Sequence, residues 1–406
     1  MKVFFRNIHL YLSLIAGVII MITCFTGAVL VFEEELQQAF NEDRYFVKAD
    51  GEKLPIETLV QNVKKQVPEA KISSVKIHAD PERTVEVGYS VKDKKIGEPA
   101  KEEAKKEVKA NGKEGDKGGK KPERNANRKT AFVNPYSGDV VELYSYRETF
   151  FYKMFALHRW LLGSNDGIGK YVVGVCTFIF LFILITGIIL WWPKTRKILS
   201  QRITVKWTAG WKRINHDFHI VLGFYTAIFL FIFAFTGLSW SFAWFNKGVA
   251  YVTNSKLEPA EAPVSKIQAD RMDISYDNAF AAVAKQVKAV EYYNIMAPKD
   301  STGSYAINVL QAGNNMIVTD TYYVDQYSGE VVGSQKFEER NTGQKVRAGI
   351  KPVHTGAIFG MPSKIIGFIV CLLGTTFPIT GTIMWINRLR RAKKKAGKRT
   401  LESESF

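Results

Sequence analysis

The chain has 406 residues, of which 46% are hydrophobic, and a formal net charge of +17. The length allows several domains, and the positive charge by itself suggests a protein that binds nucleic acid. The placement of the charge argues against that class, because basic residues gather beside long uncharged runs. We therefore expect no nucleic-acid partner.

Four stretches of the chain contain no charged residue. At about 1.5 Å per helical residue, each is long enough to cross a hydrocarbon core of about 30 Å. The sequence therefore predicts four transmembrane helices, over residues 10–32, 171–192, 220–245 and 365–386. We interpret the first as a retained helix and not a signal peptide, because no small-residue cleavage site stands before "FEEEL".

The segments between these runs predict the orientation. The connection at residues 193–213 and the tail at residues 387–406 are strongly basic, so the positive-inside rule places both in the cytoplasm, beside anionic lipid. Both termini are then cytoplasmic. The long segments 33–150 and 246–350 are then external, since long translocated regions escape the rule.

Each long segment shows signals of a small helix on an antiparallel sheet. The first contains "IETLVQNVKKQV" at helical spacing, followed by the alternating "ISSVKIHAD" and "RTVEVGYSV". The second contains "AFAAVAKQVKAV", "GSYAINVLQA" and "MIVTDTYYVD". In both, Tyr-Ser-Gly and an acidic residue indicate a tight turn between strands. Residues 92–129 are rich in Lys, Glu and Gly, which predicts a disordered insertion.

The two halves of the chain resemble each other. "FVNPYSGDVVE" corresponds to "YVDQYSGEVVG", and all four apolar runs end in similar words: "CFTGAVLVF", "LITGIILWW", "AFTGLSWSF" and "PITGTIMWI". The fold class that we predict is a four-transmembrane-helix bundle with two external α+β domains and an internal tandem repeat. Gly27, Gly187, Gly237 and Gly381 of these words either allow close helix packing or leave space for a flat macrocycle.

Five of the six histidines lie at predicted membrane boundaries, whereas His78 lies in an external strand. Ionisable groups beside hydrocarbon are costly and tend to mark function. His9 and His219 occupy matching positions at the cytoplasmic side, and His158 and His354 at the external side. Each pair can approach one ligand from opposite faces.

Zinc usually requires further N, S or carboxylate ligands, and no such cluster accompanies either pair. Haem iron needs only two axial ligands, and two neutral imidazoles suit it. We therefore expect two b-type haems, an inner one held by His9 and His219 and an outer one held by His158 and His354. His216 lies three residues before His219 and is the second choice of ligand, or a propionate or water partner.

Nearby cations are candidate partners of the haem propionates. They are Arg6 and Arg213 at the cytoplasmic side, and Arg159 and Lys351 at the external side. Ordinary snorkelling to the membrane interface explains each of them equally well. The three cysteines lie in different apolar runs without C-x-x-C spacing, so we expect no redox pair.

These motifs resemble the PepSY-associated transmembrane helix family. The resemblance rests on "NIHLYLSLIAGVIIMITCFTG", "LHRWLLG", "NHDFHIVLGF", "WWPKTRK" and the two "YSG[DE]VV" turns. Some members resemble ferric-siderophore reductases of the bacterial inner membrane, which carry haem b. The resemblance implies haem ligation at His9, His219, His158 and His354. The lysine-rich insertion at residues 92–129 departs from a compact PepSY domain.

Two functions remain open at this point. The first is an oxidoreductase that passes electrons through two haems to a ferric siderophore or another iron chelate outside the cytoplasm. Its short cytoplasmic segments hold no nucleotide-binding motif, so a cytoplasmic reductase or quinol must supply the electron. The alternative is a membrane-anchored PepSY protein that binds or regulates a partner without redox activity. A proton-coupled transporter is disfavoured, because the four runs contain no carboxylate.

Overall fold

A computed structural model describes residues 1–91, 128–266, 273–313 and 318–403. Within these residues, four helical stretches are long and apolar enough to cross a membrane. They are α1 (Lys2–Val31), α6 (Ile168–Trp191), the stretch Trp211–Ser241 and α13 (Met361–Ser403). Because α1 begins at Lys2, His9 lies within the helix and not at its N-terminal end.

The third of these stretches changes its winding. It consists of α8 (Trp211–Asp217), a π-helical segment η2 (Phe218–Leu222) and α9 (Gly223–Ser241). Short π segments inside α-helices are rare and frequently occur at functional sites. This one carries His219.

The four stretches pack as a bundle. α1 contacts α6 and α13, and α9 contacts the same two helices. The shared core includes Ala16, Ile20, Cys24, Leu230 and Val370. Many large apolar side chains elsewhere on these helices are exposed, which is typical of a lipid-facing surface.

The remaining regular structure is centred on one eight-stranded antiparallel sheet with the order β4-β3-β2-β1-β5-β6-β7-β8. Its strands are β1 (Lys71–His78), β2 (Val85–Ser90), β3 (Arg128–Val133), β4 (Val140–Tyr144), β5 (Val290–Met296), β6 (Ser304–Gln311), β7 (Thr319–Asp325) and β8 (Val331–Gln335). We expected two separate small domains. The structure instead joins both halves into one sheet, because β1 and β5 pair from Ser74↔Met296 to His78↔Tyr292.

Two helices cover one face of this sheet. They are α4 (Ile56–Gln66) and α11 (Tyr276–Ala284), and they bury a core that runs through both halves. The predicted Tyr-Ser-Gly turns join β3 to β4 and β7 to β8. Gly138 and Gly329 adopt φ angles of +78° and +75° there, a conformation that favours glycine.

Short helices connect the sheet to the bundle. They are α2 (Glu33–Phe40), α3 (Glu42–Tyr45), η1 (Tyr146–Glu148), α5 (Phe150–Trp160), α10 (Ala243–Val252), α12 (Thr342–His354) and η3 (Ala357–Phe359). The basic connection contains α7 (Arg196–Ile203), and the basic tail continues α13 as a helix to Ser403. Of the predicted insertion 92–129, only Arg128 and Lys129 lie among the described residues, and both belong to β3.

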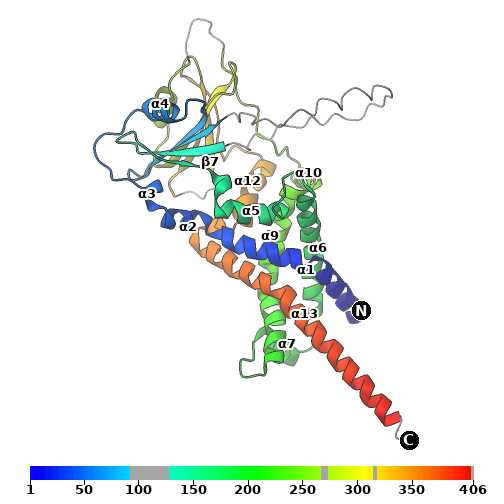
Figure 1. Cartoon of the computed structure of the whole chain (residues 1–406). Coiled ribbons are helices and arrows are strands. Elements are labelled where there is room, and N and C mark those ends of the chain that lie inside the picture. Colours follow the sequence, from blue (N-terminus) through cyan, green and yellow to red (C-terminus); the bar gives the residue numbers. More distant parts are fainter. Residues whose placement is uncertain (92–127, 267–272, 314–317, 404–406) are drawn as a thin grey trace, which may run out of the picture.

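The molecule therefore has two distinct ends. Figure 1 shows the sheet at one end of the bundle, and α7 and the C-terminal part of α13 at the other. We call these the sheet end and the basic end. α5 and α12 lie between the sheet and the long helices (Figure 1). α5 follows the edge strand β4 through η1, and α12 is the next helix after the edge strand β8.

Candidate functional site

The structure brings the four predicted ligand histidines together as two pairs. His9 of α1 and His219 of η2 form the basic-end pair, with 6.4 Å between ring centroids. His158 of α5 and His354 of α12 form the sheet-end pair, with 6.2 Å between ring centroids. In each pair, one ring comes from the first half of the chain and the other from the second half.

In the basic-end pair, each ring is held through its Nδ1 atom. His9 Nδ1 lies 3.0 Å from both the carbonyl oxygen of Ile183 and Thr186 Oγ1. His219 Nδ1 lies 2.9 Å from Thr380 Oγ1. Thr186 and Thr380 both donate their hydroxyl hydrogens to carbonyls of their own helices, so their oxygens accept from the rings. Nδ1 therefore carries the proton, and Nε2 is left free as a lone-pair donor.

The sheet-end pair is held in the same manner. His158 Nδ1 lies 2.9 Å from the carbonyl oxygen of Thr23 and 3.0 Å from Thr26 Oγ1. His354 Nδ1 lies 2.9 Å from the carbonyl oxygen of Phe233 and 3.2 Å from Thr236 Oγ1. In all four histidines, Nδ1 therefore carries the proton and Nε2 is free. A metal ion can bind this tautomer through Nε2.

The recurring Thr-Gly words explain how these rings fit. Each word supplies the threonine that holds one ring and a glycine against which that ring lies. A Cβ atom added to Gly27, Gly187, Gly237 or Gly381 would lie 3.3, 3.3, 3.2 or 3.0 Å from Cε1 of His158, His9, His354 or His219. The sequence left open whether these glycines allow close helix packing or leave space for a macrocycle. The structure shows that an imidazole from another helix lies against each of them. The sequence shows this signal only as four Thr-Gly dipeptides, one in each apolar run, because each dipeptide is far along the chain from the histidine that it contacts.

Burial keeps the sheet-end pair uncharged. It lowers the pKa of His158 and of His354, and the neighbouring Arg159 guanidinium lowers both further. Neutral imidazole is the form that ligates a metal ion. Within the described residues, no group of three or more His, Cys, Asp and Glu side chains could hold a metal ion. In that part of the chain, neither pair is joined by a third side chain of this kind.

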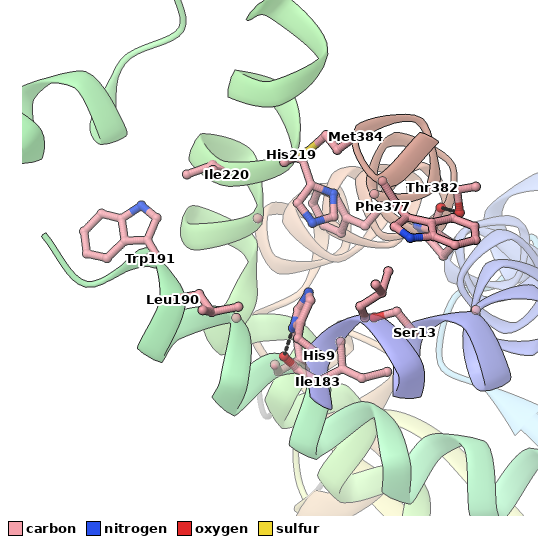
Figure 2. Close-up of a pocket in the computed structure, with 18 of the residues that line it drawn as sticks. His9, Ser13, Ile183, Leu190, Trp191, His219, Ile220, Phe377, Thr382 and Met384 are labelled. Atoms are coloured by element: carbon pink, nitrogen blue, oxygen red, sulfur yellow. Dashed lines mark hydrogen bonds between the residues drawn. The ribbon is translucent and has the colours of Figure 1, made fainter. Parts of the chain in front are cut away.

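A cavity of about 330 Å³ contains the basic-end pair. Figure 2 shows His9 and His219 approaching each other from α1 and from the third helical stretch, among apolar side chains. Trp191 lines the cavity and stacks on Phe224 at 3.6 Å between ring centroids. Most of the residues that line this cavity are apolar.

The predicted cation partners fall into two groups at the basic end. Arg6 lines the cavity, and so does Arg388, which we did not single out in the sequence. Arg213 instead forms an ion pair of 2.8 Å with the buried Asp217. His216 Nδ1 lies 3.1 Å from the same carboxylate, so His216 contacts Asp217 and belongs to neither pair. Asp217 stands beside His216 in the sequence and was the missed signal.

At the sheet end, Arg159 is partly buried and lies over Trp160 and Trp240, at 5.7 and 5.9 Å from the ring centroids. Burial lowers its pKa. Lys351 is exposed on α12, where its charge acts on Glu33. Burial raises the pKa of Glu33 above its usual range. His78 lies 3.0 Å from Glu86 within the sheet and takes no part in either pair.

Comparison with known protein families identifies the architecture. Residues 6–388 match the family described as PepSY-associated TM region. The chain belongs to this family. With its four apolar helices, it is a multi-pass membrane protein with a PepSY-like sheet region. No curated protein matches the chain significantly.

Proposed function

We propose that this PepSY-associated membrane protein is a two-haem electron conduit that reduces ferric siderophores or other iron chelates on the far side of a bacterial inner membrane. The observation that carries the proposal is the spacing of the two histidine pairs. An imidazole nitrogen binds a transition metal at about 2 Å, and two rings on opposite sides of one metal ion have centres about 6 Å apart. The observed separations are 6.4 and 6.2 Å.

The surroundings of the rings support the same cofactor. His9 and His219 would hold one b-type haem, and His158 and His354 the other, each through the Nε2 atom that its Nδ1 hydrogen bond leaves free. A haem held in this way supplies reversible one-electron chemistry at its iron. Arg6 and Arg388 line the basic-end cavity and are suited to pair with propionates.

The remaining parts of the proposal follow from the orientation. The positive-inside rule places α7 and the C-terminal part of α13 in the cytoplasm, and the sheet then lies outside. Each half of the chain supplies one helix to the sheet face and four strands, which supports an internal tandem repeat. Quinol or a cytoplasmic reductase gives up the electrons, and each electron converts one Fe(III) chelate to its Fe(II) form. A two-electron quinol thus serves two chelates and releases two protons.

A direct test is the absorbance of the full-length protein, purified from cells supplied with haem. We expect a low-spin spectrum typical of two imidazole ligands, with about two haems per chain. His9→Ala and His219→Ala should each remove one haem, and His158→Ala and His354→Ala the other. His216→Ala and His78→Ala are the matched controls and should retain both, because neither ring belongs to a pair.

The same measurement distinguishes the electron conduit from the alternative function. A protein that purifies colourless, with all variants alike, would show that the histidines are interface residues of a membrane-anchored binding protein. If haem is present, anaerobic mixing of the reduced protein with ferric chelates should reoxidise it. Loss of the sheet-end haem alone should abolish this reoxidation while the basic-end haem remains reducible.

A further inference from the structure

A second cavity lies at the sheet end, on the face opposite to α4 and α11. Its volume is about 830 Å³. Strands β5, β6, β7 and β8 form one wall, α12 another, and residues 257–264 a third. Figure 1 shows α12 directly below this part of the sheet.

The two halves of the sheet can be matched position by position, because their strand registers agree. Phe132 pairs with Glu86 and Glu142, and Tyr323 pairs with Ala306 and Gly333. The covering segments match as well. Val47 N donates to Glu82 O at 2.7 Å, and Ser265 N donates to Thr302 O at 2.8 Å. Residues 44 and 45 therefore correspond to residues 262 and 263.

In the first half, large charged and aromatic side chains fill this location. The Tyr45 ring lies 5.1 Å from the Phe132 ring. Arg44 forms an ion pair of 2.8 Å with Glu142. Glu86 lies 3.0 Å from His78 and is close to Lys76. The first half thus closes the location with side chains that neutralise one another.

In the second half, four of these filling side chains are replaced by small residues. Ala262 and Pro263 stand where Arg44 and Tyr45 stand, Ala306 replaces Glu86, and Gly333 replaces Glu142. Pro263 covers Gly333 closely, since a Cβ atom there would lie 2.8 Å from Pro263 Cγ. The cavity therefore arises from substitutions at matched positions and not from loose packing.

The cavity wall is cationic. Lys299, Arg340 and Arg347 line it, against one carboxylate, Asp300. Asp300 Oδ1 already accepts hydrogen bonds from the backbone N–H and hydroxyl of Thr302, at 3.0 and 2.8 Å. Arg340 donates to the carbonyl oxygen of Thr319 at 2.6 Å. Among the residues that the structure describes, no carboxylate lies within ion-pair distance of the three cations.

The rest of the polar wall is neutral and able to form hydrogen bonds. It includes Asn308, Thr321, Tyr323, Gln335 and Gln344. Guanidinium groups bind carboxylate and similar oxyanions in preference to neutral ligands. A cavity of this volume, with excess positive charge and several hydrogen-bonding groups, matches a small anion rich in oxygen atoms.

One helix links this cavity to the sheet-end pair. Gln344 and Arg347 line the cavity, and Lys351 and His354 follow at helical spacing on the same face of α12. At 1.5 Å per residue, Arg347 and His354 are separated by about 10 Å along the axis. A ligand bound here lies close to the sheet-end pair without contacting it.

We propose that this cavity is the binding site of an anionic, oxygen-rich chelate, such as a ferric hydroxycarboxylate. The identification of the anion as an iron chelate rests on the proposed function, whereas the anion site itself rests on the cavity and its charges. In the first half of the chain, Arg44, Tyr45, Glu86 and Glu142 fill the corresponding location.

The experiment uses gallium(III) citrate, which resembles ferric citrate in charge but is not reduced. Binding to the full-length purified protein is measured by calorimetry. Arg347→Glu reverses an exposed charge of the wall, and Ala306→Phe fills the cavity. We expect each to weaken binding about tenfold or more. Lys285→Glu is the matched control, since this exposed residue directly follows α11 on the opposite face of the sheet and should bind as the unmodified protein does.

The outcomes separate the two proposals. Absence of gallium(III) citrate binding, or equal affinity in Arg347→Glu and Lys285→Glu, would overturn the cavity proposal even if ferric citrate is reduced. Normal binding by a protein that carries no haem would uphold the cavity and overturn the electron conduit. Ala306→Phe must show the same elution profile as the unmodified protein, as a sign that it folds. If Ala306→Phe does not fold, Arg347→Glu alone tests the cavity proposal.

Discussion

At the scale of single residues, the most informative contact is the one between a histidine and a Thr-Gly dipeptide on another helix. A ring that lay against an alanine would be displaced, and a ring without an acceptor at Nδ1 could adopt either tautomer. Thr380 and Gly381 provide both conditions for His219, through a 2.9 Å hydrogen bond and open space. The dipeptide therefore determines where Nε2 lies and which nitrogen carries the proton.

A substitution at the glycine should reveal this requirement. In Gly381→Ala the new Cβ atom would lie 3.0 Å from His219 Cε1, so the ring must shift. We expect the basic-end haem to be bound roughly tenfold more weakly, a change typical of altered support around a ligand. Haem content per chain after gel filtration measures the effect.

Gly223→Ala is the control for this change. Gly223 lines the same cavity, but a Cβ atom there meets nothing within 4 Å. It should retain both haems. Equal haem loss in the two variants would mean that the cavity as a whole, and not the fit of the His219 ring, is sensitive to added volume.

Sequence reasoning reached the four histidines and their grouping because matching positions in two similar halves are visible in a linear pattern. It did not find that Asp217 engages Arg213 and His216, although Asp217 lies only four residues after Arg213 and directly after His216. Arg388 was also missed. It lies among many basic residues of the tail, and only the path of α13 shows that it lines the cavity.

At the scale of elements, the helices α4 and α11 cap each other across the two halves. Asp277 accepts hydrogen bonds from the backbone N–H groups of Ile56 and Glu57, at 2.7 and 2.9 Å. In return, Glu57 lies 3.5 Å from the backbone N–H of Tyr276. A carboxylate at a helix N-terminus satisfies free N–H groups and interacts favourably with the helix dipole.

Removing this contact should destabilise the sheet region. We expect Asp277→Ala to lower the free energy of unfolding by about 1–2 kcal/mol, the usual loss when a helix cap is removed. Thermal unfolding of the purified protein, followed by circular dichroism, measures the difference. Glu52→Ala removes an exposed carboxylate before α4 and should leave the midpoint unchanged; an equal shift in both variants would contradict a capping role.

The long apolar helices were predictable because their length and lack of charge can be recognised without knowing which segments they pack against. β5 was missed, since its residues are partly buried on both faces and show no clear alternation. α5 and α12 were also missed. Both are short, and their positions follow from the edges of the sheet that they leave, which no local pattern records.

At the scale of the whole molecule, the joining of two halves into one sheet was not predictable. Pairing of β1 with β5 connects segments far apart in the chain, and alternation within a strand does not identify its partner. The separation of charge between the two ends was predictable. It predicts the orientation of the protein in its membrane.

Labelling of single cysteines tests that orientation. In intact cells, a maleimide that does not cross membranes should reach Lys65→Cys on α4. It should reach Lys197→Cys on α7 only after lysis, if the basic end lies in the cytoplasm as the positive-inside rule predicts. The natural cysteines give little background, since Cys24 and Cys176 are buried and Cys371 is partly so. Labelling of Lys197→Cys in intact cells would show the opposite orientation, with the proposed chelate-binding cavity in the cytoplasm.

The division of each histidine pair between the two halves has a consequence for assembly. His9 and His158 come from the first half, and their partners His219 and His354 from the second. Either half, produced alone, would contain one ring of each pair and could not form a complete pair. Two separately synthesised halves would therefore bind the proposed haems only after they associate, and haem absorbance would measure that association.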